Sequence, residues 1–97
     1  QVVGVFPFNG TDYTGKTVDF DVLGYTNSGA VTMTVELWNL SLVSLVTSVT
    51  ISSISTATAS SLAISAATDT TYEIRASITT GSPGDSGTVQ YAGFRIH

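Results

Sequence analysis

A strict alternation of apolar and polar residues over 31–38 is the feature that most limits how this chain can fold. The odd positions are all apolar, and the even positions hold Thr, Thr, Glu and Trp. Because successive side chains of a β-strand point to opposite faces, this period of two predicts a strand with one buried face. An α-helix needs apolar residues three and four apart, and no window of the chain shows that spacing convincingly.

The same period recurs along the chain and predicts further strands. The expected segments are residues 2–8, 17–22, 43–51, 62–66, 71–78 and 89–96. The inward side chains of the 71–78 strand are predicted to be Tyr72, Ile74, Ala76 and Ile78. The two aspartates of the 17–22 strand are predicted to point outward.

The last predicted strand changes parity midway. Val89 and Tyr91 fall on one face, whereas Phe94 and Ile96 fall on the other. An extra residue at 92–93 would bring both pairs to the core, and the glycine there tolerates the backbone angles that such a β-bulge needs.

Clusters of Gly, Asn, Asp and Ser at 9–12, 26–29 and 81–87 separate these strands and predict turns. Seven or eight short strands joined by turns predict one all-β domain over residues 1–97. We expect an antiparallel, jelly-roll-like sandwich of two sheets. Residues 52–70 are rich in Ser, Thr and Ala. They predict an edge strand, a loop and a short strand, or alternatively a flat surface that packs against another chain.

The composition excludes several function classes. Only 10% of the residues are charged, and the net charge is -4. The three basic residues lie far apart in the sequence, which argues against binding to nucleic acid. No apolar run approaches ~18 residues, so we expect no membrane insertion. The absence of cysteine excludes disulfides and thiolate metal sites.

Groups suited to catalysis are scarce. His97 is the only histidine and the last residue, where chains commonly fray. Asp19 and Asp21 would project the same way, about 6.5–7 Å apart, as a carboxylate pair or calcium ligands. No acidic loop accompanies them, so solvated carboxylates on a strand face are the preferred interpretation. We expect a protein that is not an enzyme and that needs no cofactor or metal.

Trp38 is the most informative single residue, because its parity places it on the outward face of its strand. Tryptophan is enriched at the centres of protein interfaces, and it also stacks on sugar rings. A third interpretation is a strand-end side chain covered by its own loop. As a sugar platform, Trp38 would need Tyr13, Tyr25 and Asp12 beside it, and all three are expected in turns.

A second outward set is charged. Glu73 and Arg75 share a face opposite the apolar side of their strand, and Glu36 and Arg95 could pair with them across strands. Such ion pairs contribute only about 0–1 kcal/mol when exposed. The set is predicted to form either a solvated face or a subunit contact.

Five segments together resemble small jelly-roll β-sandwich domains of bacteriophage virion proteins and of some secreted bacterial proteins. They are NGTDY (9–13), VDFDV (18–22), VELWNL (35–40), TYEIRA (71–76) and YAGFRI (91–96). The likeness extends from about residue 6 to residue 97, and the chain has Glu36 where the pattern often carries Arg. The resemblance implies a capsid-decoration, fibre or glycan-binding domain, often trimeric.

We therefore expect a structural domain on a virion that binds other protein subunits, including copies of itself, with a trimer as one expected state. The segment 2–8 could also act as an arm exchanged between neighbours. The alternative is a carbohydrate-binding module on a phage or on a secreted or cell-surface bacterial protein. A surface-filament subunit is a third expectation.

Overall fold

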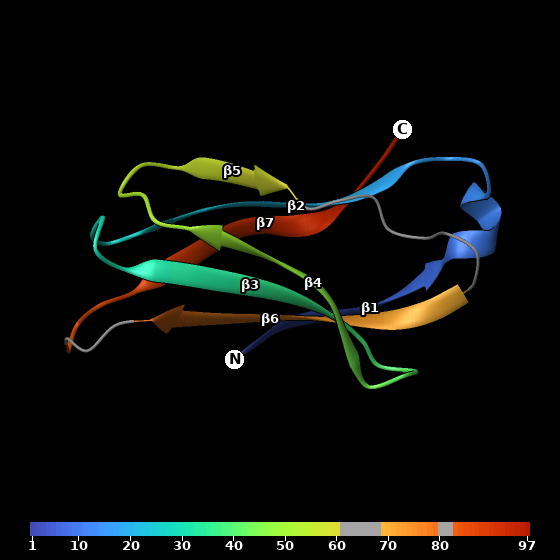
Figure 1. Ribbon diagram of the computed structural model, residues 1–97, viewed down its shortest axis with the longest axis horizontal. Coiled ribbons are helices and arrows are strands. Elements are labelled where there is room, and N and C mark those ends of the chain that lie inside the picture. Colours follow the sequence, from blue (N-terminus) through green and yellow to red (C-terminus); the bar gives the residue numbers. More distant parts are fainter. Residues whose placement is uncertain (61–68, 80–82) are drawn as a thin grey trace.

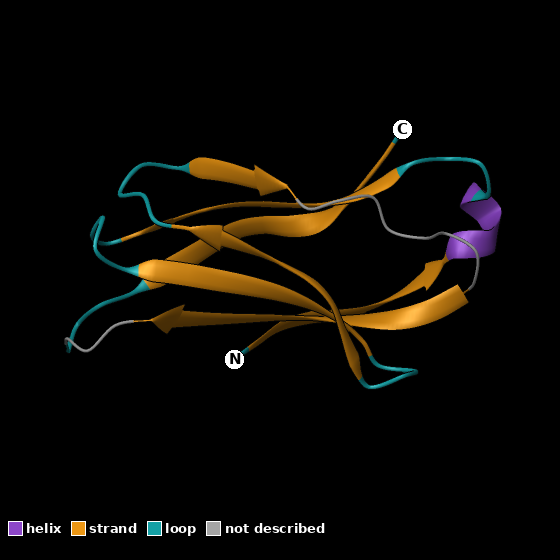
Figure 2. Cartoon of the chain, viewed as in Figure 1, coloured by secondary structure: helices purple, strands orange, loops and turns teal. Residues whose placement is uncertain are grey.

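The computed structural model describes residues 1–60, 69–79 and 83–97 of the chain. Its strands are β1 (Val2–Asn9), β2 (Val18–Thr26), β3 (Thr32–Asn39), β4 (Ser44–Ile51), β5 (Ala57–Ser60), β6 (Asp69–Thr79) and β7 (Gly87–Ile96). One short 3-10 helix, η1 (Gly10–Tyr13), follows β1 and occupies the first predicted turn (Figure 2).

The strands form two antiparallel sheets that pack face to face as a sandwich (Figure 1). One sheet has the order β1-β6-β3-β4, and the other has the order β5-β2-β7. Among the described strands, β3 and β4 are the one consecutive pair in the same sheet, and every other consecutive pair is divided between the two sheets. The predicted all-β, jelly-roll-like antiparallel sandwich is therefore confirmed.

The two central strands show the predicted alternation most clearly. In β3 the odd residues from Met33 to Leu37 are buried, and in β2 the even residues from Val18 to Val22 are buried. Each sheet thus presents one apolar face, and the core lies between the two faces. Burial of a side chain of this size contributes about 1.5–3 kcal/mol.

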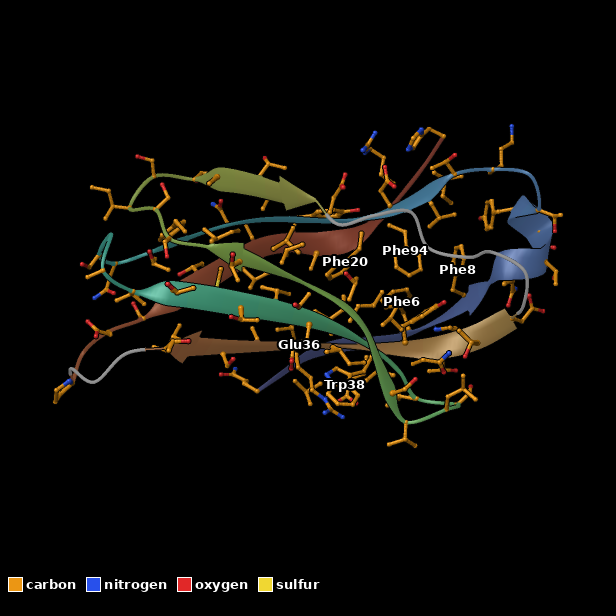
Figure 3. The ribbon with its side chains drawn as sticks, in the orientation of Figure 1. Phe6, Phe8, Phe20, Glu36, Trp38 and Phe94 are labelled. Carbon is orange, nitrogen blue, oxygen red and sulfur yellow. The ribbon has the colours of Figure 1, made fainter. Side chains whose placement is uncertain are left out.

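A group of aromatic rings closes one end of the core. The ring centroid of Phe94 in β7 lies 4.7 Å from that of Phe8 and 5.2 Å from that of Phe6, both from β1. It also lies 5.1 Å from the ring of Tyr72 in β6. Burial raises the pKa of the Tyr72 phenol. The labelled phenylalanines meet between the two sheets in Figure 3.

The predicted inward face of β6 is only partly correct. Tyr72 and Ile74 are buried and Ala76 is half-buried, but Ile78 is exposed. The reason is that pairing between β1 and β6 ends where Gln1 meets Ala76, so nothing from β1 covers Ile78.

The predicted position of the bulge in β7 is wrong. Leu23 of β2 pairs with Tyr91 and Gly24 pairs with Val89, so the extra residue is Gln90. This shift puts Val89, Ala92 and Phe94 against the core and leaves Tyr91 outside.

Gly93 has a different role from the one predicted. A Cβ atom at Gly93 would lie 2.7 Å from the hydroxyl oxygen of Tyr91, so the Tyr91 side chain lies over the space that glycine leaves open.

The remaining segments follow the prediction where they are described. Strand β5 pairs only with β2 and is the expected edge strand. Strand β4 matches the expected 43–51 segment except that it begins at Ser44. The predicted strand at 62–66 lies outside the described residues.

Candidate functional site

Four outward side chains meet on the outer face of the four-stranded sheet, and we call them the outer cluster. They are Glu36, Trp38, Glu73 and Arg75. The register of β3 against β6 places Glu36 opposite Arg75 and Trp38 opposite Glu73. Figure 3 shows Glu36 and Trp38 together, apart from the phenylalanines of the core. The outward position predicted for Trp38 is confirmed.

The outer cluster is held by three polar or electrostatic contacts. The Arg75 guanidinium carbon lies 4.2 Å from the centroid of the Trp38 ring. Arg75 Nη2 donates to Glu73 Oε2 at 3.2 Å, and Trp38 Nε1 donates to Glu36 Oε1 at 3.3 Å. Cation–π contacts of this kind contribute about 0.5–2 kcal/mol, depending on how far water is excluded.

The electrostatics of the outer cluster are unbalanced. Glu73 is only 9% exposed, so its carboxylate depends on Arg75 for compensation. The cluster holds two carboxylates, Glu36 and Glu73, and one guanidinium, which leaves one negative charge in excess. A cationic group on a binding partner would complete the set.

Aliphatic side chains flank the outer cluster on both sides. Across the sheet, Val5 of β1 pairs with Glu73, and Leu45 of β4 pairs with Trp38. Val2 pairs with Arg75. All three are about half exposed. The outer cluster with Val2, Val5 and Leu45 forms one continuous surface, which we call the outer patch.

The sequence analysis did not predict that Val2, Val5 and Leu45 lie beside the outer cluster. The outward position of Val5 follows from parity, because the even-numbered residues Phe6 and Phe8 of the same strand point inward. Leu45 had no such signal, because an extra residue at Val46 shifts the register of β4 against β3.

Arg95 does not join the outer cluster, contrary to the prediction. It lies in β7 of the other sheet, where its Nη2 contacts Asp19 Oδ2 at 2.9 Å and its Nε contacts Asp21 Oδ2 at 2.8 Å. The two carboxylates face outward as predicted, but they are not solvated, since their side chains are only 15% and 17% exposed.

His97 Nε2 also lies 2.8 Å from Asp19 Oδ2. These groups therefore form a bridge between the ends of β2 and β7 rather than an open carboxylate pair. Within residues 1–60, 69–79 and 83–97, no three acidic, His or Cys side chains are grouped so that they could hold a metal ion.

The tyrosines proposed as companions of Trp38 lie elsewhere. Tyr13, at the end of η1, stacks on Phe8 with the ring centroids 5.3 Å apart. Tyr25 lies in strand β2 of the other sheet rather than in the predicted turn. Asp12 is an exposed residue of η1. In the described part of the chain, neither tyrosine ring contacts Trp38.

The structure also shows a link that sequence reasoning did not foresee. Asp69 is the first residue of β6. Its Oδ1 accepts hydrogen bonds from the Thr11 backbone nitrogen at 3.0 Å and from Thr11 Oγ1 at 2.8 Å. These two bonds hold the pKa of the Asp69 carboxyl below its usual value.

The tip of the β3–β4 hairpin carries the most exposed aliphatic side chains of the described residues. Leu42 and Val43 are each 74% exposed. Val43 also has a φ of 50°, in the left-handed region that β-branched residues rarely adopt.

Comparisons with known proteins gave no match, whether with family models, curated proteins or solved structures. Among the residues that the structure describes, no helix has the length and apolar character needed to cross a membrane. The fold and the outer patch together define a two-sheet β-sandwich with a tryptophan–arginine surface.

Proposed function

We propose that this chain is a non-enzymatic structural domain of a virion, of the capsid-decoration or fibre type, that acts by binding other protein chains. The outer patch is the observation that carries the proposal. Tryptophan and arginine are among the side chains most enriched at the energetic centres of protein interfaces, and here aliphatic residues flank them.

The edges of the four-stranded sheet support the same proposal. Neither β1 nor β4 contains a charged side chain, although exposed strand edges usually carry charges that prevent pairing with other chains. Pro7 in β1 is the one residue there that cannot donate a backbone hydrogen bond. These edges favour contact with another protein over a fully solvated surface.

The geometry favours a protein partner over a sugar. Arg75 already covers the Trp38 ring at 4.2 Å, and the tyrosines that would extend a sugar platform lie elsewhere. The assignment to a virion depends on the resemblance of the five sequence segments to phage domains.

Light scattering on the purified protein tests the protein-binding role. We expect the wild type to show the mass of an oligomer, such as a trimer. Trp38→Ala should weaken the assembly by about 30-fold or more, because residues at interface centres often contribute at least 2 kcal/mol. Thr34→Ala is the matched control, since Thr34 lies on the same face of β3 outside the outer cluster.

Two results would contradict the proposal. One is that the wild type is monomeric at every concentration and binds glycans on an array, and that Trp38→Ala abolishes this glycan binding. The other is an oligomer whose mass does not change with Trp38→Ala. Circular dichroism of each variant confirms that it is folded.

The genes beside the coding sequence test the virion part. Capsid and portal genes alongside are the expected result. A position among genes for polysaccharide-degrading enzymes would contradict a virion role and favour a carbohydrate-binding one.

A further inference from the structure

The two sheets have unequal numbers of strands among the described residues. The first has four and the second has three, whereas an eight-stranded jelly roll divides its strands between two sheets. Strand β7 pairs with β2 along one edge, and no described segment pairs with its other edge. In the described part of the chain, that edge of β7 lies beside β1, an edge strand of the facing sheet.

A groove of about 510 Å³ runs along this edge. Its lining includes Val3 of β1, Met33 of β3, Ala76 and Ile78 of β6, and Gly87 and Val89 of β7. Figure 1 shows that β6 ends on the side of the sandwich where β7 begins, and both strands contribute to the lining. These apolar side chains share the lining with the polar residues Gln1, Ser77, Asp85 and Ser86.

The other half of the same side of the sandwich is closed. There Phe94 of β7 packs against Phe6 and Phe8 of β1. Gly4 lies between this aromatic group and the groove, and it pairs with the inward residue Ile74. A Cβ atom built on Gly4 would have no neighbour within 4 Å. The interior between β1 and β7 is therefore filled at one end and empty at the other.

The chemistry of the groove specifies its occupant. A free strand edge offers a row of unpaired backbone N–H and C=O groups, and an added β-strand is the element that satisfies such a row. The aliphatic members of the lining, such as Val3, Ile78 and Val89, favour aliphatic side chains at alternate positions of that strand. The first seven residues of β7, from Gly87 to Gly93, carry no charge, so the edge itself places no electrostatic barrier to addition.

We propose that the free edge of β7 binds a β-strand donated by another protein chain, antiparallel to β7, with alternate aliphatic side chains that enter the groove. This inference rests on the proposed function and names the kind of partner segment that the domain takes. Among the described residues, Gln1 pairs with Ala76 of β6 and lines the groove.

A synthetic peptide of alternating Val and Thr, capped at both ends, is the probe. We expect it to bind the full chain, to slow hydrogen exchange at residues 87–91 and to raise the Tm. The same peptide with proline at alternate positions lacks the required N–H groups and should not bind.

Two valines of β1 give a matched pair of variants. Val3 lines the groove, whereas Val5 belongs to the outer patch, and both are about half exposed, so that glutamate is tolerated at either position. Val3→Glu should weaken peptide binding at least 10-fold, while Val5→Glu should leave it unchanged. Gly4→Val, which extends a side chain into the open space, should weaken it as well.

Three outcomes would overturn the inference. They are failure of the peptide to bind, equal effects of Val3→Glu and Val5→Glu, and amides at 87–91 already protected in the peptide-free monomer. In each case the proposed function stands if Trp38→Ala still dissociates the assembly. If Trp38→Ala leaves the assembly intact while the peptide still binds, the outer patch is not the subunit interface, and the groove remains the proposed binding site.

Discussion

At the scale of single residues, Val43 is the position where sequence and backbone disagree most. Its φ of 50° is unfavourable for an L-residue by about 1–2 kcal/mol, and its side chain is exposed, so little burial offsets this. A hairpin tip that keeps two exposed aliphatic residues, one of them strained, is typical of a contact surface rather than of a turn optimised for stability.

Val43→Asn should therefore stabilise the fold by about 1 kcal/mol, because asparagine adopts left-handed backbone angles more readily. Urea unfolding measures the change. Leu42→Asn is the control, since Leu42 is equally exposed and has no positive φ. Equal effects of the two substitutions would show that the backbone angle is not the cause.

The Asp69–Thr11 link predicts a dependence of stability on pH. Folding lowers the pKa of Asp69, so the ionised form stabilises the folded state, and this contribution is complete above the ordinary aspartate pKa of about 3.9. It is lost as the pH falls through the lowered value. Wild type should be more stable than Asp69→Asn near neutral pH, and the difference should shrink in strong acid.

Thermal unfolding from neutral to strongly acidic pH checks this dependence. Asp12→Asn removes the same charge from the exposed surface of η1 and serves as the control. A constant difference between wild type and Asp69→Asn across the pH range would show that the hydrogen bonds to Thr11 do not favour the carboxylate.

At the scale of elements, one inserted residue decides which side chains of β7 reach the core. Gln90 is the residue skipped in the pairing with β2, and it allows Val89 and Phe94, which differ in parity, to face the same way. Its side chain accepts a hydrogen bond from Thr56 Oγ1 at 3.0 Å on the outer surface. The bulge is thus required for Val89 and Phe94 to pack in the core together.

Deletion of Gln90 should destabilise the domain by about 3 kcal/mol or more, because either Val89 or Phe94 must then leave the core. Gln90→Thr keeps the residue count and should change stability by no more than about 0.5 kcal/mol. Urea unfolding of the two variants separates the length of β7 from the identity of its side chain. A deletion variant as stable as wild type would contradict the assigned bulge.

At the scale of the whole molecule, the chain crosses between the sheets at nearly every connection. Apart from β3 and β4, consecutive described strands therefore lie in opposite sheets, and most pairings join segments distant in sequence, such as β1 with β6 and β2 with β7. Because both sheets bury their inner faces against each other, neither can lose its partner and keep its core.

We accordingly expect one cooperative unfolding transition. Fluorescence of Trp38, on the outer face of the four-stranded sheet, and far-ultraviolet circular dichroism should give coincident curves in urea. Two separated transitions would show that the sheets unfold independently and that residues 1–97 are not a single folding unit.

The parity of the residues along each strand explains which features of the fold could be predicted from the sequence. Alternation in β3 and β2 predicts strand positions, the buried residues of both and the outward side of Trp38, because each follows from local geometry. The same logic failed at Ile78, since the burial of that side chain depends on how far β1 extends along β6. It also failed at Gln90, since a bulge is defined only against the partner strand.

The sequence by itself determined that this protein is an all-β sandwich with an outward tryptophan, because a period of two and a scarcity of charge leave few other ways to bury its apolar residues. Only the tertiary structure decided which of these side chains contact one another. Arg75 covers Trp38, whereas Arg95 bridges Asp19 and Asp21 on the other sheet. Strand order and register join residues far apart in the sequence, and a local pattern carries no information about that distance.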